Sequence, residues 1–282
     1  MTVSTSQAPR SSAALIPSAV SPQSVDMRAG AVHIGFTEDA SDIEDAQRLR
    51  YKVFAEHPGY SDGIGDASTG LDADRFDEYC THLLVRHVDH GVIGCARLLL
   101  PPAAIAAGGW YSATEFDIAA LDPLLPSTIE MGRACVAEAH RDGSVTALMW
   151  AAVLRYLETT GHNHLMGCVS VPLSDRSGRG VTLRGVRDVV REKYSAPYAV
   201  VPHERPMVDG VALDDIEPPA RTVLPPLLRG YIRLGARTCG DPAIDNVFDV
   251  GDLLTLVNPD DTDIRYLTRL RNAADRLSTT EG

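Results

Sequence analysis

The residues that determine our fold prediction are Thr128-Ile-Glu-Met-Gly-Arg-Ala-Cys-Val136 and the turn Arg141-Asp-Gly-Ser144 that follows them. The first stretch is largely apolar and reads as a β-strand. Ser144 is a suitable N-cap for a helix, and Gly161 is a suitable C-terminal stop for it. The short apolar run Leu165–Val171 predicts a second strand, so the order strand, helix, strand favours a parallel pair.

Two charged residues stand inside this apolar strand, Glu130 and Arg133. Burying a charge is costly unless it is paired or hydrogen-bonded. Strict alternation would place positions 130 and 133 on opposite faces, but a β-bulge at Gly132 would turn both toward one cleft. The two residues are therefore our candidate site, with a structural salt bridge as the alternative.

The rest of the chain predicts further helices and strands and an α/β fold class. A capping box of the form S-x-x-E begins at Ser41 and predicts a helix that ends at about Phe54. The alternating runs Thr81–Val88 and Val92–Leu100 are separated by a turn, which predicts a β-hairpin. The later elements are a helix that opens at Pro226 and a strand over Phe248–Val257.

Arg50 lies four residues after Ala46 and four before Phe54, so it projects from the apolar side of the predicted helix. A guanidinium in that position needs a partner, because buried arginines are normally paired. The partner is either an acid in the segment 72–77 or a bound ligand, and the sequence leaves both open.

The charge balance excludes one class of partner. The formal net charge is −12, which repels nucleic-acid phosphates, so we expect no nucleic-acid binding. The segment 175–193 nevertheless concentrates basic residues. If it is helical, Arg184, Arg187 and Arg191 share one face, which either docks an acidic carrier protein or is a solvated helix face.

We expect three parts in the chain. Residues 1–31 are rich in Ser, Ala and Pro without a continuous apolar stretch, which predicts a disordered leader and neither a signal peptide nor a membrane anchor. Residues 32–258 would form the folded domain, and residues 259–282 a C-terminal helix and tail. The five cysteines are widely spaced and include no CxxC pair, so we expect free thiols and a cytoplasmic protein.

Several segments together resemble the ornithine-lipid-forming N-acyltransferases, which belong to the hemolysin-like branch of the GNAT superfamily. Those segments are Arg50–Phe54, Asp74–Asp77, His82–Val85, Gly94–Leu98, Tyr111–Ser112, Glu115–Asp117, Glu130–Val136, Leu165–Val171 and Leu224–Gly235, followed by Asp245 and Phe248. Thr81 and Ala134 depart from the family pattern, in which we expect an acid and a serine. Part of the set is also similar to acyl-homoserine lactone synthases, namely Arg50, Phe54, Arg97, Phe116, Glu130 and Arg133.

The resemblance implies the GNAT acyl-CoA N-acyltransferase fold, a mixed central sheet flanked by helices with one splayed strand pair. The strand 128–136 would separate from the next strand, and the pantetheine arm of the acyl donor would enter the gap. Backbone N–H groups at a helix start bind phosphate, which marks the turn after this strand. The donor-binding candidates are Val136, Arg141, Gly143 and Ser144, and the acyl chain would contact Leu83, Val85, Leu98, Leu100, Trp110, Phe116 and Met131.

The implied reaction transfers a fatty acyl group, with or without a 3-hydroxyl, from acyl carrier protein, or from coenzyme A, to the α-amine of ornithine. The product would be lyso-ornithine lipid, and we expect no further cofactor and no metal. Glu130 would act as general base, and backbone N–H groups at the bulge beside Arg133 would receive the oxyanion. Arg50 and Arg133 would hold the substrate carboxylate, and Asp74 or Asp77 the distal ammonium. Phe54, Arg97 and Phe116 complete the expected substrate site.

Other readings remain open. One is a signal synthase that acylates S-adenosylmethionine, or another amino-acid N-acyltransferase that uses acyl-CoA. Another is a non-enzymatic module that only binds acyl groups. A thiol nucleophile, Cys80 or Cys135 beside His82, is a third, and metal binding by His87 with His90 or by His162 with His164 is a fourth. Because the expected product is amphipathic, transient contact with a membrane surface is a further expectation.

Overall fold

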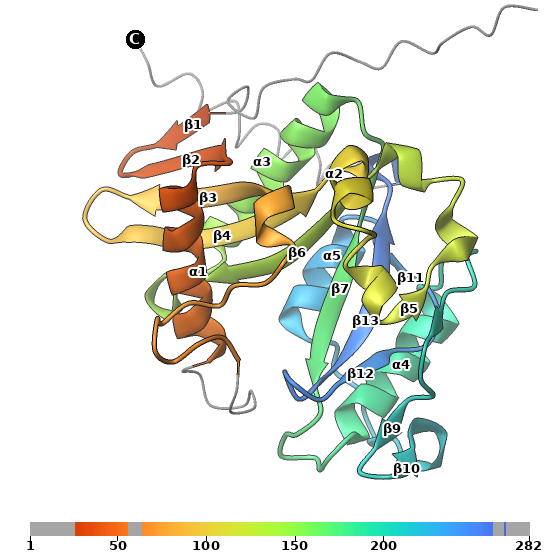
Figure 1. Cartoon of the computed structure of the whole chain (residues 1–282). Helices are drawn as coiled ribbons and strands as arrows, with labels where there is room; N and C mark the ends of the chain where they lie inside the picture. Colours follow the sequence, from red (N-terminus) through yellow and green to blue (C-terminus); the bar gives the residue numbers. More distant parts are fainter. Residues whose placement is uncertain (1–25, 56–63, 262–267, 269–282) are drawn as a thin grey trace, which may run out of the picture.

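The structure is a computed structural model and describes residues 26–55, 64–261 and 268. Its centre is a nine-stranded mixed sheet with the strand order β1-β2-β3-β4-β6-β7-β13-β11, in which β12 also pairs with β13 (Figure 1). The strands of this sheet are β1 Asp26–Ala29, β2 Val32–Thr37, β3 Thr81–His87, β4 Gly91–Leu99, β6 Thr128–Val136, β7 His164–Pro172, β11 Arg237–Thr238, β12 Ala243–Asp245 and β13 Val250–Val257.

The helices and the remaining short strands surround this sheet. The helices are α1 Ala40–Phe54, α2 Pro101–Ala106, α3 Ser144–Thr160, α4 Val181–Lys193 and α5 Pro226–Arg233. Two small two-stranded sheets pair β5 Phe116–Asp117 with β8 Val201–Pro202, and β9 Met207–Val208 with β10 Val211–Ala212. The prediction of a mixed sheet flanked by helices is confirmed.

The sheet divides between β6 and β7. These two strands are parallel, but their register covers only Thr128 to Glu130 on β6 and His164 to Met166 on β7. Beyond that point β6 continues beside β4 as far as Val136, whereas β7 continues beside β13 (Figure 1). The splayed pair expected after Glu130 is therefore present.

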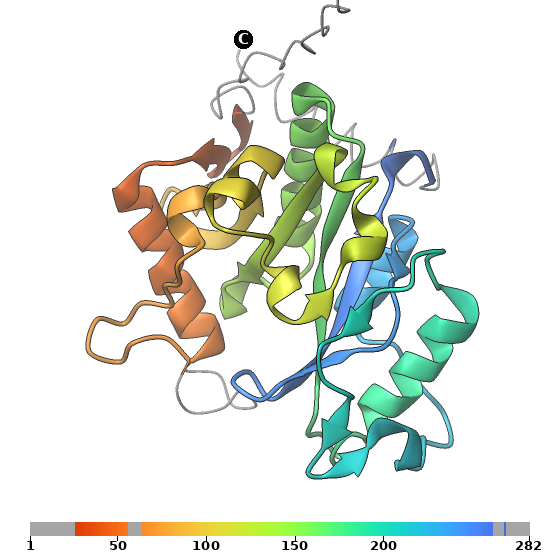
Figure 2. The ribbon, with the colours of Figure 1, turned by 45° about the vertical axis from the view of Figure 1, so that its right-hand side comes forward.

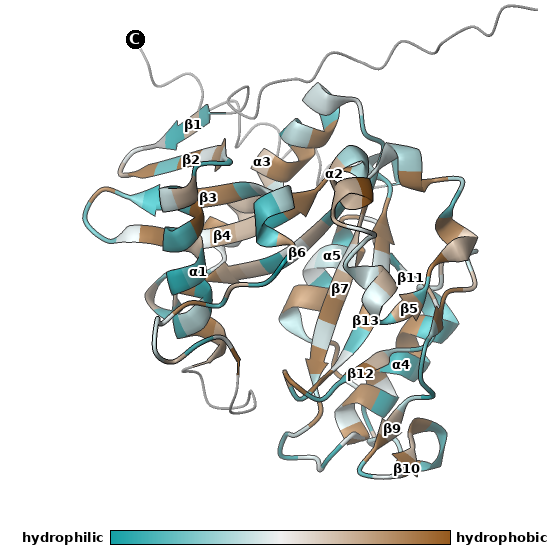
Figure 3. Ribbon diagram, in the orientation of Figure 1, coloured by the Kyte–Doolittle hydropathy of each residue, from teal (hydrophilic) through white to brown (hydrophobic). Residues whose placement is uncertain are grey.

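The two faces of the sheet pack against different helices, because successive strand residues point to opposite sides. Leu84, Cys95 and Cys135 pack with the apolar side of α1. Their neighbours Leu83 and Val85 belong to the larger core with α3. The second view shows helices on both sides of the sheet (Figure 2), and hydrophobic residues gather on the central strands (Figure 3).

Two sequence predictions need correction at element ends. Residues 26–31 were assigned to the leader, but β1 pairs with β2 in an antiparallel hairpin whose register runs from Asp26–Gly35 to Ala29–Val32. The first helix is capped by Asp39, because its carboxylate accepts a hydrogen bond from the Ser41 amide. Ser41 is thus a helical residue rather than the cap.

Other element predictions are confirmed within one to three residues. The hairpin of β3 and β4, the helix that opens at Pro226 and the strand ending at Val257 all form. Gly161 ends α3 in the left-handed conformation at φ 72°, as expected of a stop signal. Residues 1–25 and nearly all of the predicted C-terminal helix lie outside the described residues. None of the described helices has the length and apolar composition of a membrane span.

Gly167 permits the closest approach of β6 to β7, and we expect Gly167→Ala to destabilise the protein. A Cβ at this position would lie 2.3 Å from the carbonyl oxygen of Met131, and a backbone atom cannot move aside cheaply. The expected loss is about 1–3 kcal/mol in the free energy of unfolding, measured by urea denaturation. Gly35→Ala is the matched control, because its Cβ would have no neighbour nearer than 3.7 Å. Equal stability of the two variants would contradict this account.

Candidate active site

A β-bulge on β6 shapes the site. Cys95 of β4 faces Cys135 and Arg97 faces Gly132, so two residues of β6 lie opposite the single residue between them on β4. Arg133 has φ 51°, a left-handed conformation that is uncommon for a residue with a side chain. The predicted bulge is present, and its strained residue is Arg133 rather than Gly132.

Glu130 and Arg133 line one cavity of about 170 Å³. It lies where β6 parts from β7 and β13, and residues from both halves of the sheet form its walls. The residues that contribute its charged and aromatic lining are Arg97, Glu130, Arg133, Asp245, Asp252, Phe54, Phe76, Tyr111, Tyr231 and Phe248. The bulge thus places the two charged residues of the apolar strand on a shared cavity.

Glu130 is buried and holds a neighbouring segment in place. Its two carboxylate oxygens accept hydrogen bonds from the backbone amides of Tyr111 and Ser112, each at 2.7 Å, and the Ser112 hydroxyl donates a third. Burial raises the pKa of Glu130 despite these bonds. A Glu130→Gln change would set an amide NH₂ against these donors, so it would weaken this segment as well as remove a base.

Arg133 is held loosely for a residue with so little exposure. Its nearest carboxylates, on Asp72 and Asp74, lie 3.4 and 3.3 Å away, and the Tyr111 hydroxyl lies 3.4 Å away. The Nε atom is buried and makes no hydrogen bond. The guanidinium also faces the ring of Phe248, 4.9 Å from its centroid. Its capacity for a strong bidentate contact with an anion is therefore unused.

Arg50 and Asp77 belong to a buried ion network, which corrects their assignment to the substrate. Arg50 is 1% exposed and donates to Asp72 and Asp77 at 2.8 Å. Arg97 lines the cavity, but its guanidinium donates to Asp74 and Asp77. The arginines hold the pKa of Asp77 well below its usual range even though burial opposes the shift. The ion-pair alternative for Arg50 is the correct one.

Of the remaining substrate candidates, one lines the cavity and two do not. Asp74 accepts from Arg97, faces Arg133 and does not line the cavity. Phe54 lines the cavity, whereas Phe116 is 1% exposed and packs with Ile118 and Leu121 in the core. Phe116 is therefore a core residue, not a substrate contact.

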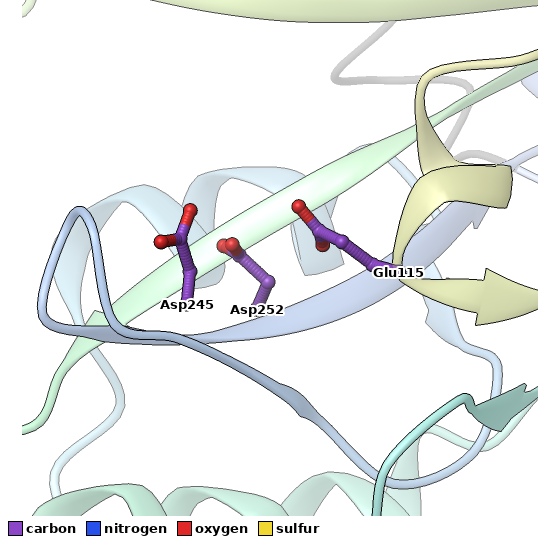
Figure 4. Close-up of side chains that lie close together, drawn as sticks. All are labelled: Glu115, Asp245 and Asp252. Carbon is purple, nitrogen blue, oxygen red and sulfur yellow. The ribbon is translucent and has the colours of Figure 1, made fainter.

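Sequence reasoning missed an acidic trio formed by Glu115, Asp245 and Asp252 (Figure 4). One carboxylate oxygen from each lies within 4.8 Å of the others, close enough to share a cation such as an ammonium group or a metal ion. Asp245 and Asp252 line the cavity. Burial, followed by the neighbouring carboxylates, raises the pKa of Glu115 to about 8, and burial raises that of Asp252 to about 6.

A second, larger cavity of about 580 Å³ adjoins the first. It lies between α3, α5 and the end of β6, and its lining includes the predicted donor residues Val136, Arg141 and Gly143. Ser144 is the first residue of α3. Its amide and its hydroxyl both donate hydrogen bonds to the Asp142 carboxylate, so Ser144 is not the predicted phosphate contact. The two cavities share Phe54, Met131, Ala134, Leu227 and Tyr231 and therefore meet at the bulge.

The prediction that the arginines of α4 form a carrier-docking face is wrong. Arg187 is 2% exposed and is paired with Asp188, Asp214 and Asp241. Arg184 donates to backbone carbonyls of the segment 213–216, so both arginines fasten α4 to the body of the protein. Helical spacing identified a shared face correctly but could not show that this face is turned inward. Only Arg191 of the three is exposed.

The structure gives little support to the two alternative chemistries, a thiol nucleophile and a metal site of histidines. Burial raises the pKa of the Cys80 thiol to about 12, and the adjacent Cys95 thiol, together with burial, raises the pKa of Cys135 well above its ordinary value. The ring of His82 is hydrogen-bonded to the Asp77 carbonyl. Neither cysteine is thus prepared as a nucleophile. Near the surface, the rings of His87 and His90 stack with centroids 4.4 Å apart.

The domain comparison agrees with the fold and the paired cavities. Residues 49–151 match the acetyltransferase (GNAT) domain family. The splayed mixed sheet, the bulge and this match together define an acyltransferase of the GNAT class.

Similarity to characterised proteins then identifies the family. The chain is 30% identical over 249 residues to an L-ornithine N(alpha)-acyltransferase of Rhizobium meliloti (strain 1021), covering 85% of this chain and 84% of that protein. It is 28% identical over 262 residues to the protein of the same name from Agrobacterium fabrum (strain C58), covering 89% of each. The chain belongs to the L-ornithine N(alpha)-acyltransferase family.

The comparison with solved structures also found matches at low sequence identity. A CoA-dependent acyl-homoserine lactone synthase, BjaI, solved with SAM and isopentyl-CoA, has a TM-score of 0.47 at 15% identity, over 86% of this chain and 85% of that one.

The raised pKa of Glu115 predicts how stability changes with pH. The pKa of this carboxyl rises from about 4.3 in the unfolded chain to about 8 in the folded protein. Its protonated form therefore contributes stability that is complete at pH values below about 4.3 and is lost as the pH rises toward 8. Urea denaturation of the wild type should therefore show stability falling across this window. Glu115→Gln should flatten the fall, whereas the exposed Glu204→Gln should not. Parallel pH profiles for all three proteins would refute the assignment.

Proposed function

We propose that this protein transfers a 3-hydroxy fatty acyl group from acyl carrier protein to the α-amine of ornithine, giving an N-acylated ornithine. The observation that supports this best is the junction of the two cavities at the bulge. One cavity offers a guanidinium whose Nε makes no hydrogen bond, together with acidic groups for an amino acid, and the other offers an apolar space for an acyl donor.

The charges of the smaller cavity suit a diamino acid. Arg133 is the proposed partner of the substrate carboxylate, because its Nε has no hydrogen bond and its other contacts are long. Asp245 and Asp252, supported by Glu115, are the proposed partners of the distal ammonium, in place of Asp74 and Asp77. A cation there would relieve the repulsion among the carboxylates, which adds to burial in raising the pKa of Glu115.

In the proposed mechanism the α-amine nitrogen attacks the thioester carbonyl carbon, the C–S bond breaks, and the proton lost by the amine neutralises the departing thiolate. A free α-amine with a pKa of about 8 is about one-tenth neutral at pH 7, and a lysine-like side-chain amine about 10²-fold less, which favours the α-position. Glu130 is the proposed base, directly or through water, because burial raises its pKa. Backbone N–H groups freed by the bulge at 132–134 are the proposed oxyanion donors.

The acyl donor is proposed to arrive on an acidic carrier protein that docks beside α5. Arg229 and Arg233 are exposed on this helix, and neither has an ion-pair partner among the described residues. Like charges four residues apart weaken a helix, so a partner's acidic surface would relieve their repulsion. Arg141, at the larger cavity, adds a third exposed cation.

The cytoplasm is the proposed compartment, since all five cysteines are free thiols. The amphipathic product also leads us to propose transient contact with a membrane surface during release.

The deciding experiment is a free-thiol release assay with 3-hydroxyacyl carrier protein and a panel of amines, with products identified by mass. The proposal expects ornithine to respond far more strongly than glycine, lysine or S-adenosylmethionine. Labelled lactone from S-adenosylmethionine would favour the signal-synthase alternative. Binding of the donor without thiol release under any amine would favour a non-enzymatic acyl-binding module.

Asp252→Asn should reduce the preference for a distal amine. The asparagine retains an oxygen for the Ser170 hydroxyl, which lies 2.6 Å from Asp252, but it removes the charge. We expect kcat/KM for ornithine to fall about tenfold or more, and that for norvaline, which has the same carbon chain without the distal amine, to change less than about twofold. The exposed Asp122→Asn is the control. Equal losses for both amino acids would exclude this role.

Charge reversal on α5 should separate carrier-borne from CoA-borne donors. Arg229→Glu combined with Arg233→Glu should raise KM for acyl carrier protein several-fold and leave kcat nearly unchanged, because docking and not chemistry is affected. KM for acyl-CoA should change much less. Arg191→Glu provides an exposed arginine on α4 as the control. A similar rise for both donors would rule out docking at α5.

A further inference from the structure

Gly230 occupies the interior of α5 without a structural reason for being glycine. A glycine costs a helix about 1 kcal/mol relative to alanine. Its φ is not positive, so the backbone does not require it, and a Cβ built there would meet no atom within 4 Å. Gly185 in α4 is different, because its Cβ would meet Pro219 at 2.7 Å. Packing explains Gly185 and leaves Gly230 unexplained.

The open space beside Gly230 belongs to the larger cavity, which Gly230 itself lines. The neighbouring walls are apolar and aromatic. Trp150 of α3 and Tyr231 of α5 meet edge to face with centroids 4.7 Å apart, and Met149 and Leu227 extend the surface. Arg141 is the charged residue of this lining. A cavity of this composition is suited to an apolar chain rather than to the amino acid.

The cavity also differs from the acyl slot that the sequence suggested. Most of the apolar residues expected to line that slot, such as Leu83, Val85 and Leu98, are core residues that do not reach the cavity. Met131 is the exception, and it lies where the two cavities meet. An acyl chain whose thioester is at the bulge therefore has the space between α3 and α5 beside it.

We propose that the missing side chain of Gly230 keeps the α5 wall of this cavity open and sets the length of acyl chain that the protein accepts. This inference rests on the proposed acyl transfer. A larger side chain at position 230 would extend into the cavity and exclude long chains, while short chains would still leave the thioester at the bulge.

The test compares full-length wild type, Gly230→Ala and Gly230→Leu with butanoyl-CoA and hexadecanoyl-CoA at saturating ornithine. Donors on CoA avoid the carrier-docking step. We expect Gly230→Leu to lose about tenfold or more in kcat/KM for the hexadecanoyl donor and less than about twofold for the butanoyl donor. Gly230→Ala should shift the same ratio in the same direction by less, with an equal or higher Tm.

Equal losses with both donors would overturn the proposal, since they would place the pantetheine arm rather than the acyl chain beside Gly230. Unchanged kinetics with both donors would overturn it as well. If Gly230→Leu does not fold, Gly230→Ala decides, because alanine favours the helix. Arg155→Leu, on the exposed side of α3, adds the same side chain outside the cavity and should not alter the ratio.

Failure of the proposed function can be told apart from failure of this inference. If the wild type acylates ornithine neither with these two CoA donors nor with 3-hydroxyacyl carrier protein, the proposed function fails. Calorimetric binding of the two acyl-CoA donors still measures the effect of position 230 in that case. Gly230→Leu should then weaken binding of hexadecanoyl-CoA selectively, and equal affinities in wild type and variant would refute the inference.

Discussion

The backbone of β6 has to accommodate one residue more than β4 opposite it, between the partners of Arg97 and Cys95. The extra residue places Arg133 in a left-handed conformation, and the ladder to β7 has already ended at Glu130. An ordinary pair of parallel strands would leave no room between them. The cavities and the inward guanidinium of Arg133 both follow from this departure from regular pairing.

The charged residues around the bulge form two groups that differ in net charge. Three arginines, Arg50, Arg97 and Arg133, lie among three aspartates, Asp72, Asp74 and Asp77, so this network is formally neutral. Among the described residues no salt bridge joins the acidic trio to a cation, and burial, with the neighbouring carboxylates in addition, raises the pKa of Glu115 and of Asp252. The first group surrounds Arg133 with acidic residues, whereas the second is the group that we propose for the distal ammonium of the substrate.

The sequence was informative where a residue contradicted its local pattern. Glu130 and Arg133 were conspicuous as charges in an apolar strand, and Gly132 suggested the bulge. Asp252 is an equally conspicuous charge in the apolar strand β13, and the same reasoning applied to it would have revealed part of the trio. Its proximity to Glu115 could not be read, because that contact joins residues more than a hundred positions apart.

Predictions that depended on which side of an element faces outward were less reliable. The arginines of α4 have the spacing of a docking face, yet Arg187 is turned toward Asp214 and Asp241. Arg50 could equally have met a ligand or an acid, and only the fold of the segment 72–77 decides between them. Periodicity gives the relative orientation of side chains on one helix but not what that helix packs against.

The meeting of the two cavities at Met131 and Ala134 has a consequence for turnover. In the proposed reaction each reactant occupies one compartment, but the product joins a zwitterionic head to an apolar tail and so would occupy both compartments at once. It therefore combines the contacts of both reactants in one molecule. We therefore expect departure of the finished molecule, rather than bond formation, to be the slow step of the cycle, and an apolar acceptor outside the protein to accelerate it.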